Sequence, residues 1–184
     1  GVLRAVGTGE FTLVGSGMGG AVAWMTAHRK PPLLKSVVTV CAPHPMTRRA
    51  ASAPKAIAAR RVERELTLSP FKHKRMQDGA LVRRILKTWC APDCATHMAE
   101  VSPLYEAPLQ RVFASAAALE TLDGSKGTPL AARRTFKEPV RVPVWSVIGG
   151  MDGRVAVSAY SKDAREAQSA VTHLEIPGSG HFPS

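Results

Sequence analysis

The sequence predicts an α/β fold in which a parallel sheet is interrupted by a helical insertion. Residues 11–41 contain a strand pattern, a helix pattern and a second strand pattern, which together make a βαβ unit. Two more strand patterns lie near the end of the chain, and residues between the two halves are rich in Ala, Arg, Lys and Leu. We therefore expect sheet in residues 1–45, a helical insertion in 46–138 and more sheet in 139–184.

The first βαβ unit can be followed residue by residue. Phe11–Val14 is a short apolar run bounded by glycines, which indicates a buried strand. Gly15–Gly20 is expected to form a tight turn, and Ala21–His28 an apolar helix that ends before Pro31-Pro32. Ser36–Cys41 is almost continuous in β-branched residues, as in a strand buried on both faces.

The later elements follow the same logic. Leu81–Trp89 has apolar residues at helical spacing, which predicts a helix inside the insertion. Val142–Ile148 is expected to be a strand and Ser158–Ala170 a helix with Ser158 as its cap. Val171–Ile176 is expected to be the last strand. A sheet that starts abruptly at Phe11 leaves an uncovered edge, so we expect the chain to be part of a larger domain.

Composition excludes several classes of protein. The chain has 184 residues, of which 45% are hydrophobic and 21% charged, as in a globular protein. No apolar run approaches the roughly 18 residues of a membrane span, and no signal peptide is recognisable. The net charge is +11, but only 5% of residues are aromatic. We interpret the basic residues as a solvated helical surface and expect no specific nucleic-acid partner; their runs are Arg48-Arg49, Arg60-Arg61, Lys72–Arg75, Arg83-Arg84 and Arg133-Arg134.

The cysteines give little sign of a disulfide framework or a metal centre. Three cysteines are present, an odd and low number that favours a reducing, cytoplasmic location. Cys90, Cys94 and His97 could supply three metal ligands, but their spacing matches no standard zinc pattern. We therefore predict no metal and no cofactor.

The turn after the first strand has the context of a nucleophile elbow. A strand, a glycine-rich turn and a helix follow one another, as in the pattern G-x-Nu-x-G. Aligning the flanking glycines places Gly17 in the nucleophile position, where no side chain can attack a substrate. A shifted register would make Ser16 the nucleophile, with Val14 and Met18 in positions that need small residues.

The same turn has a second interpretation. Gly15-x-Gly17-x-x-Gly20 matches the glycine fingerprint of dinucleotide-binding folds. That fingerprint also needs an acidic residue after the second strand, and the sequence there is Val40–Pro43. The match is therefore weak.

Two further loops carry chemistry after predicted strands. Asp152 follows the strand at 142–148, and an aspartate there can orient a histidine. His181 lies in a loop of small residues after the last strand and could act as a general base. Taken singly, Asp152 could be a turn residue and His181 a structural one. The order of elbow, acid and histidine is more specific than any one of them.

These motifs together resemble the α/β-hydrolase fold superfamily, and in particular its epoxide hydrolase branch. The resemblance covers 11–20, 143–152 and 176–183, and Ala42–Pro45 resembles the Pro-His-Pro segment that leads into the cap. Residues 66–89 resemble its helical cap, so the fold implied is a partial α/β-hydrolase fold with an inserted helical cap. The resemblance implies Asp152 as the orienting acid, His181 as the base, and Tyr105 as a cap tyrosine that holds the epoxide oxygen.

The sequence departs from that branch at the nucleophile. An aspartate would stand where this chain has Gly17, and only the backbone N–H of Met18 remains as an oxyanion donor. We therefore expect an epoxide hydrolase-like protein with a small apolar substrate, impaired or inactive as given. The alternatives are a family member that binds a small ligand without catalysis, and a truncated gene fragment.

Overall fold

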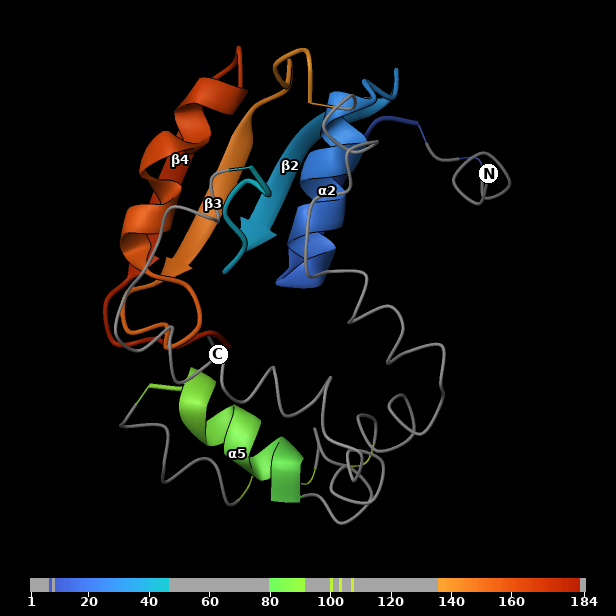
Figure 1. Cartoon of the computed structure of the whole chain (residues 1–184). Coiled ribbons are helices and arrows are strands. Elements are labelled where there is room, and N and C mark those ends of the chain that lie inside the picture. Colours follow the sequence, from blue (N-terminus) through green and yellow to red (C-terminus); the bar gives the residue numbers. More distant parts are fainter. Residues whose placement is uncertain are drawn as a thin grey trace. The chain divides into compact units, whose positions relative to one another are not determined.

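The structure is a computed structural model and describes residues 7, 9–46, 80–91, 100, 103, 107 and 136–182. The chain divides into two compact units, and each is treated by itself below. Unit 1 comprises residues 1–50, 129–148 and 157–176, and unit 2 comprises 51–128, 149–156 and 177–184. The elements, shown in Figure 1, are β1 (Phe11–Ser16), α2 (Met18–His28), β2 (Leu34–Val40), α5 (Ala80–Trp89), β3 (Val144–Gly149), the 3-10 helix η3 (Val157–Glu166) and β4 (Val171–Ile176).

The strands form one sheet in the order β1-β2-β3-β4. β1 pairs parallel with β2, with Ser16 opposite Val40, and β2 pairs parallel with β3, with Thr39 opposite Ser146. The parallel sheet predicted from the βαβ pattern is confirmed. β4 coincides with its predicted range, whereas β3 begins two residues later than predicted because Pro143 has no N–H to give to the ladder.

A pair of hydroxyl groups lies inside the sheet between β2 and β3. Thr39 Oγ1 and Ser146 Oγ are 3.1 Å apart, and both residues are fully buried. A one-residue slip of β2 against β3 would turn Thr39 to the opposite face of the sheet and leave the buried Ser146 hydroxyl without this partner. The pair therefore helps to fix the register of these strands.

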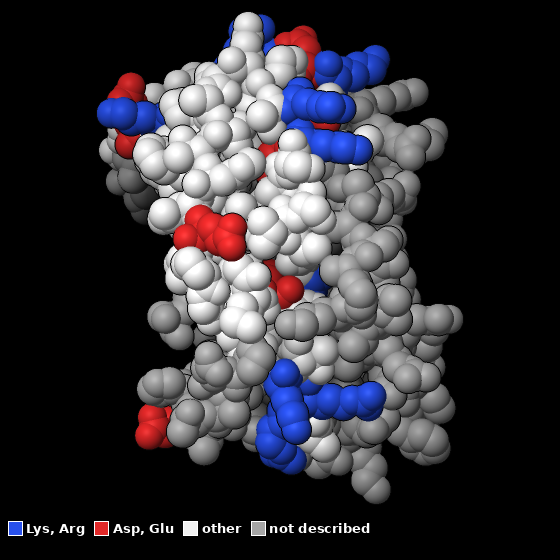
Figure 2. Space-filling view, turned by 90° about the vertical axis from the view of Figure 1, so that its left-hand side faces the viewer, with Lys and Arg blue, Asp and Glu red and all other residues white. Residues whose placement is uncertain are grey.

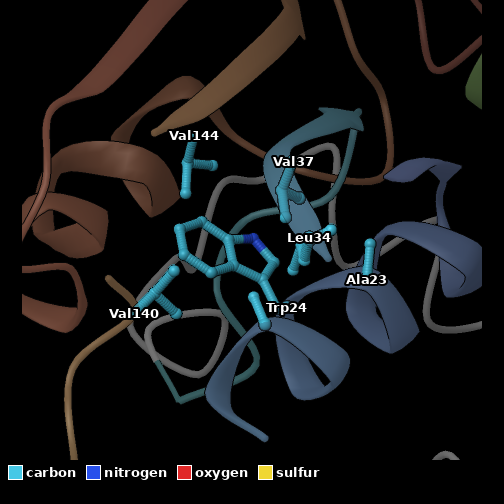
Figure 3. Packing of buried hydrophobic residues seen from close by; sticks show 7 residues of the cluster. Ala23, Trp24, Leu34, Val37, Val140 and Val144 are labelled. Atoms are coloured by element: carbon cyan, nitrogen blue, oxygen red, sulfur yellow. The ribbon is translucent and has the colours of Figure 1, made fainter. Parts of the chain in front are cut away.

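The hydrophobic core of unit 1 is built around Trp24. Its ring is fully buried, and its Nε1–H donates to the backbone oxygen of Ala42 at 3.3 Å. Figure 3 shows the ring among side chains of α2, β2, β3 and the segment before β3: Ala23, Leu34, Val37, Val140 and Val144. Removing a buried ring of this size typically costs about 3–5 kcal/mol. The core thus joins α2 to the sheet, and α2 packs against β1 and β2.

The predicted six-residue turn at Gly15–Gly20 is wrong in its length. β1 continues through Ser16 and α2 begins at Met18, so the chain reverses at Gly17 alone. The glycines on either side lie within regular elements, and they allow those elements to approach closely. At its other end α2 stops at His28, and Lys30 takes a positive φ of 51° just beyond the helix.

The helix predicted at Ser158–Ala170 is present but shorter, and Ser158 lies inside it and is not its cap. The segment is a 3-10 helix that covers Val157–Glu166. Beyond it, Ala167 forms a parallel bridge with Val140, whose N–H donates to the Glu166 oxygen at 2.9 Å. This pairing draws the backbone out of the helix before the predicted end.

The helix predicted inside the insertion is confirmed. It is α5 (Ala80–Trp89), which starts one residue before the prediction. Leu86 is buried, whereas Arg83, Arg84 and Lys87 are exposed, as expected of an amphipathic helix. The division of the chain into residues 1–45, 46–138 and 139–184 remains a prediction.

Most of the predicted basic runs lie outside the described residues. On the face drawn in Figure 2, Lys and Arg side chains lie in small groups, some of them beside acidic residues. Among the described residues, no helix has the length and apolar character that crossing a membrane requires.

Candidate active site

The turn between β1 and α2 has the backbone conformation of a sharp elbow. Gly17 has φ 52° and ψ −113°, a region that residues with a side chain rarely adopt. Its N–H donates to the oxygen of Val40 at 2.9 Å, and its oxygen accepts from Ala21 N–H at 3.2 Å. Ser16 is the last residue of β1 and is exposed. The geometry therefore places Gly17, not Ser16, at the apex of the turn.

The neighbouring glycines are needed for close packing within unit 1. A Cβ on Gly15 would lie 2.3 Å from the oxygen of Gly19, and a Cβ on Gly20 would lie 2.3 Å from the Cβ of Ala42. Contacts within the chain thus account for the glycines of the dinucleotide fingerprint. Met18 is the first residue of α2, where backbone N–H groups have no partner in the helix. This position is compatible with its predicted role as an oxyanion donor.

Asp152 and His181 are brought together in unit 2. Asp152 follows β3 and His181 follows β4, and 2.8 Å separates Asp152 Oδ2 from His181 Nδ1. Their side chains are only 1% and 3% exposed. The other carboxylate oxygen, Oδ1, accepts backbone N–H groups of Arg154 at 2.7 Å and Val155 at 3.0 Å. The carboxylate is thereby fixed on one side by its own loop and holds the imidazole on the other.

Close contacts between backbone segments hold the two loops in place. The N–H of Met151 donates to the oxygen of Ser179 at 2.8 Å. A Cβ on Gly149 would lie 2.1 Å from the oxygen of Gly180, and a Cβ on Gly180 would lie 2.4 Å from the nitrogen of Ala91. The acid loop, the histidine loop and the segment after α5 therefore pack backbone to backbone, which only glycine permits at these positions.

Two residues beside His181 were not predicted from the sequence. Trp89, the last residue of α5, accepts the N–H of His181 on its oxygen at 2.8 Å, and its ring packs edge-on against the imidazole at 5.3 Å. Arg154 lies with Nη1 at 3.2 Å from His181 Nε2. One feature of the sequence indicated Arg154. It lies two residues after Asp152, in a loop that must reach the histidine.

A second histidine cluster lies in unit 1. His44 Nδ1 accepts the N–H of Met46 at 3.2 Å, so its proton must be on Nε2, which lies 2.8 Å from His28 Nε2. His28 therefore carries its proton on Nδ1 and donates to the oxygen of Glu138 at 2.7 Å. The rings of Trp24 and Phe136 each pack against His44 with centroids 5.0 Å away.

Burial keeps both of these histidines neutral. Burial, and then the neighbouring His28, lower the pKa of His44 from 6.5 to about 3. Burial also lowers the pKa of His28, with Glu166 acting in the opposite direction and Lys30 adding to the effect. The Pro43-His44-Pro45 segment noted in the sequence is thus a structural junction between α2, the end of β2 and the segment before β3.

Some predicted site residues lie outside the described residues. These are Tyr105, predicted as a cap tyrosine, and the metal-ligand candidates Cys94 and His97. Gly17 belongs to unit 1, whereas Asp152 and His181 belong to unit 2.

Solved structures with the same fold include several hydrolases. A novel epoxide hydrolase found in metagenomes from hot environments is 19% identical with a TM-score of 0.68, covering 98% of this chain and 64% of its own. A variant of an epoxide hydrolase from Bacillus megaterium is 16% identical with a TM-score of 0.69, covering 99% and 66%. For a haloalkane dehalogenase loop variant from Bradyrhizobium elkanii the values are 17%, 0.63, 98% and 63%.

The chain spans less than two thirds of the length of these structures. Among curated proteins, none matches it in sequence. The profile of the family described as alpha/beta hydrolase fold matches residues 2–184, almost the whole chain. The chain therefore belongs to the α/β-hydrolase fold family.

Proposed function

We propose that this chain is an epoxide hydrolase-like protein that keeps the acid and base of hydrolysis but has lost its nucleophile. The buried hydrogen bond between Asp152 and His181 carries the proposal. A histidine held by a carboxylate at Nδ1 is oriented to take a proton at Nε2. At the elbow, Gly17 has the backbone of a nucleophile position without a side chain.

The chemistry that remains to these residues is limited. Without a nucleophile, no covalent intermediate forms, and water activated by His181 must attack the substrate directly. The N–H of Met18 would be the oxyanion donor on this chain, and loss of one such donor typically lowers the rate by about 10²–10³. We therefore propose slow or absent hydrolysis of a small apolar epoxide or ester, with Tyr105 as the residue that holds the epoxide oxygen.

The similar solved structures include epoxide hydrolases and a haloalkane dehalogenase, and this supports a small-molecule substrate. We propose the same activity for the whole protein, and we propose that it is located in a reducing cytoplasm. The three cysteines, too few and odd in number for a disulfide framework, favour that compartment.

The test is to put the missing carboxylate back. Gly17→Asp should gain turnover of chromogenic epoxides, and adding His181→Ala should remove it. Gly19→Asp is the matched control, because it adds the same carboxylate at an exposed position two residues away and should gain nothing. Gly17→Ser, assayed on short acyl esters, tests whether the site also supports acyl transfer.

Two results would contradict the proposal. If the natural chain turns over substrate and Ser16→Ala abolishes that turnover, Ser16 is the nucleophile and the alignment on Gly17 is wrong. If Gly17→Asp folds with a cooperative melt and remains inactive against both substrate classes, the site does not support epoxide hydrolysis in this chain.

A second candidate function is binding without catalysis. The absence of a side chain at Gly17 favours it, because a glycine elbow leaves room where other members carry a nucleophile. Small apolar ligands should then raise the melting temperature in a concentration-dependent way. Gly17→Leu should abolish that rise, whereas Gly19→Leu, at an exposed position, should preserve it.

A further inference from the structure

Arg154 makes a directed contact with the nitrogen that the proposed base would use. Its Nη1 lies 3.2 Å from His181 Nε2. A guanidinium group can only donate, so Nε2 must be the acceptor and its lone pair points at Arg154. The ring proton is then on Nδ1, where it is donated to Asp152 at 2.8 Å. Both ring nitrogens are thus engaged within unit 2.

The guanidinium is fixed from more than one direction. Its Cζ lies 4.5 Å from the ring centroid of Trp89, a cation–π contact, and the backbone N–H of Arg154 donates to Asp152 Oδ1. The Trp89 ring in turn packs against the imidazole of His181 in a T-shaped arrangement, and the Trp89 backbone oxygen accepts the backbone N–H of His181. The Arg154 side chain therefore lies between an indole face and an imidazole nitrogen and is half-buried.

We propose that Arg154 masks the general base of this site. A base must offer a lone pair to the proton it removes, and here a charged donor already occupies that lone pair. His181 can act only after the guanidinium moves away from Nε2. The inference rests on the proposed function, since a masked lone pair affects turnover only if His181 is the base. Arg154 is thus a positioning residue, because it acts through His181.

Arg154→Met separates the effect of the hydrogen bond from the effect of the packing. Methionine keeps an unbranched chain that can cover the indole of Trp89 but cannot donate a hydrogen bond. Arg154→Lys keeps a charged donor, and it is the conservative variant. If the guanidinium protects Nε2 only by covering it, Arg154→Met should behave as the natural chain does. If the hydrogen bond protects it, Arg154→Lys should stay close to the natural chain and Arg154→Met should not.

The first readout is the rate at which diethyl pyrocarbonate modifies His181, measured on peptides by mass spectrometry. The reagent attacks an available imidazole lone pair. Arg154→Met should react at His181 at least about tenfold faster, since a hydrogen bond to a charged group no longer has to break. His173 is exposed on β4 and serves as the internal reference, whose rate should be the same in all three proteins.

The second readout is the ¹⁵N chemical shift of His181 Nε2 in long-range ¹H–¹⁵N spectra. It should move in Arg154→Met toward the value of a nitrogen without a hydrogen bond, and Arg154→Lys should restore it. Equal modification rates and an unchanged shift in folded Arg154→Met would overturn the proposal. Neither readout needs turnover, so a folded but inactive Gly17→Asp variant would contradict the proposed function and leave this result standing.

Discussion

Gly17 and Gly19 are two residues apart, yet a methyl group added to each should have opposite effects. Gly17 has φ 52° and ψ −113°, so Gly17→Ala should lose about 1–3 kcal/mol of stability through backbone strain. Gly19 lies in α2 with nothing within 4 Å of an added Cβ, and Gly19→Ala should gain up to about 1 kcal/mol. Thermal melts of the two variants should therefore shift in opposite directions. A Gly17→Ala melt equal to that of the natural chain would show that the elbow is not strained.

The carboxylate of Asp152 has three partners, which sets the effect of replacing it. Asp152→Ala leaves the N–H groups of Arg154 and Val155 and the Nδ1–H of His181 without an acceptor. Each lost partner costs about 1–3 kcal/mol when it stays buried, so the variant should lose more than about 2 kcal/mol in urea unfolding.

Asp152→Asn is the matched control for that prediction. Its amide oxygen can still accept the two backbone N–H groups of the loop, so it should lose less stability than Asp152→Ala. A larger loss for Asn than for Ala would show that the charge of Asp152, rather than its hydrogen bonds to the loop, supports the fold.

At the scale of the elements, the contact between the histidine loop and the segment after α5 depends on glycine. Gly180→Ala would bring a Cβ to 2.4 Å from the backbone nitrogen of Ala91, which cannot move away cheaply. The variant should lose about 1–3 kcal/mol. Gly178→Ala, in the same loop with nothing within 4 Å, should stay within about 0.5 kcal/mol of the natural chain. Similar melts for the two variants would contradict the backbone contact.

The helices and strands also show how much of the fold could be predicted from the sequence. Strands β1, β2 and β4 were predicted because a run of β-branched or apolar residues is a local property. The end of η3 was not, because it depends on the bridge between Ala167 and Val140, which lie 27 residues apart. The predicted turn at Gly15–Gly20 was too long because glycines suggest loops. Here they serve close approach between a strand and a helix instead.

The candidate site, like the fold, could be predicted only in part. Asp152 and His181 could be predicted because each follows a strand in a recognisable order. The partners of His181 could not, because Trp89 and Arg154 reach it through the packing of separate segments. No spacing in the sequence connects position 89 to position 181. The role of each of these residues in catalysis remains a prediction.

At the scale of the whole molecule, the buried histidine pair should make stability depend on pH. The pKa of His44 is about 3 in the folded protein and near 6.5 in the unfolded chain. Between these values the unfolded chain binds a proton that the folded protein does not. The free energy of unfolding should therefore be fully present above pH 6.5 and fall as the pH is lowered toward 3.

His44→Gln tests this prediction. It removes the titrating group and should make the free energy of unfolding fall less steeply between pH 6.5 and 3, although its value near pH 7 will be lower because the contacts with Trp24 and Phe136 change. Urea unfolding at several pH values measures both slopes. Equal slopes in the two proteins would show that His44 does not titrate with folding.

The glycine at position 17 also bears on evolutionary reversal. In a hydrolase that uses the elbow, the nucleophile is held in a conformation that its side chain disfavours, and the rest of the fold must supply the stability. If Gly17 stands in place of a nucleophile, as we propose, this chain does not need that extra stability, and later destabilising substitutions would be tolerated. A single mutation back to aspartate would then meet a less tolerant background. A stabilising substitution elsewhere would have to come first. The proposed loss of the nucleophile would therefore be difficult to reverse.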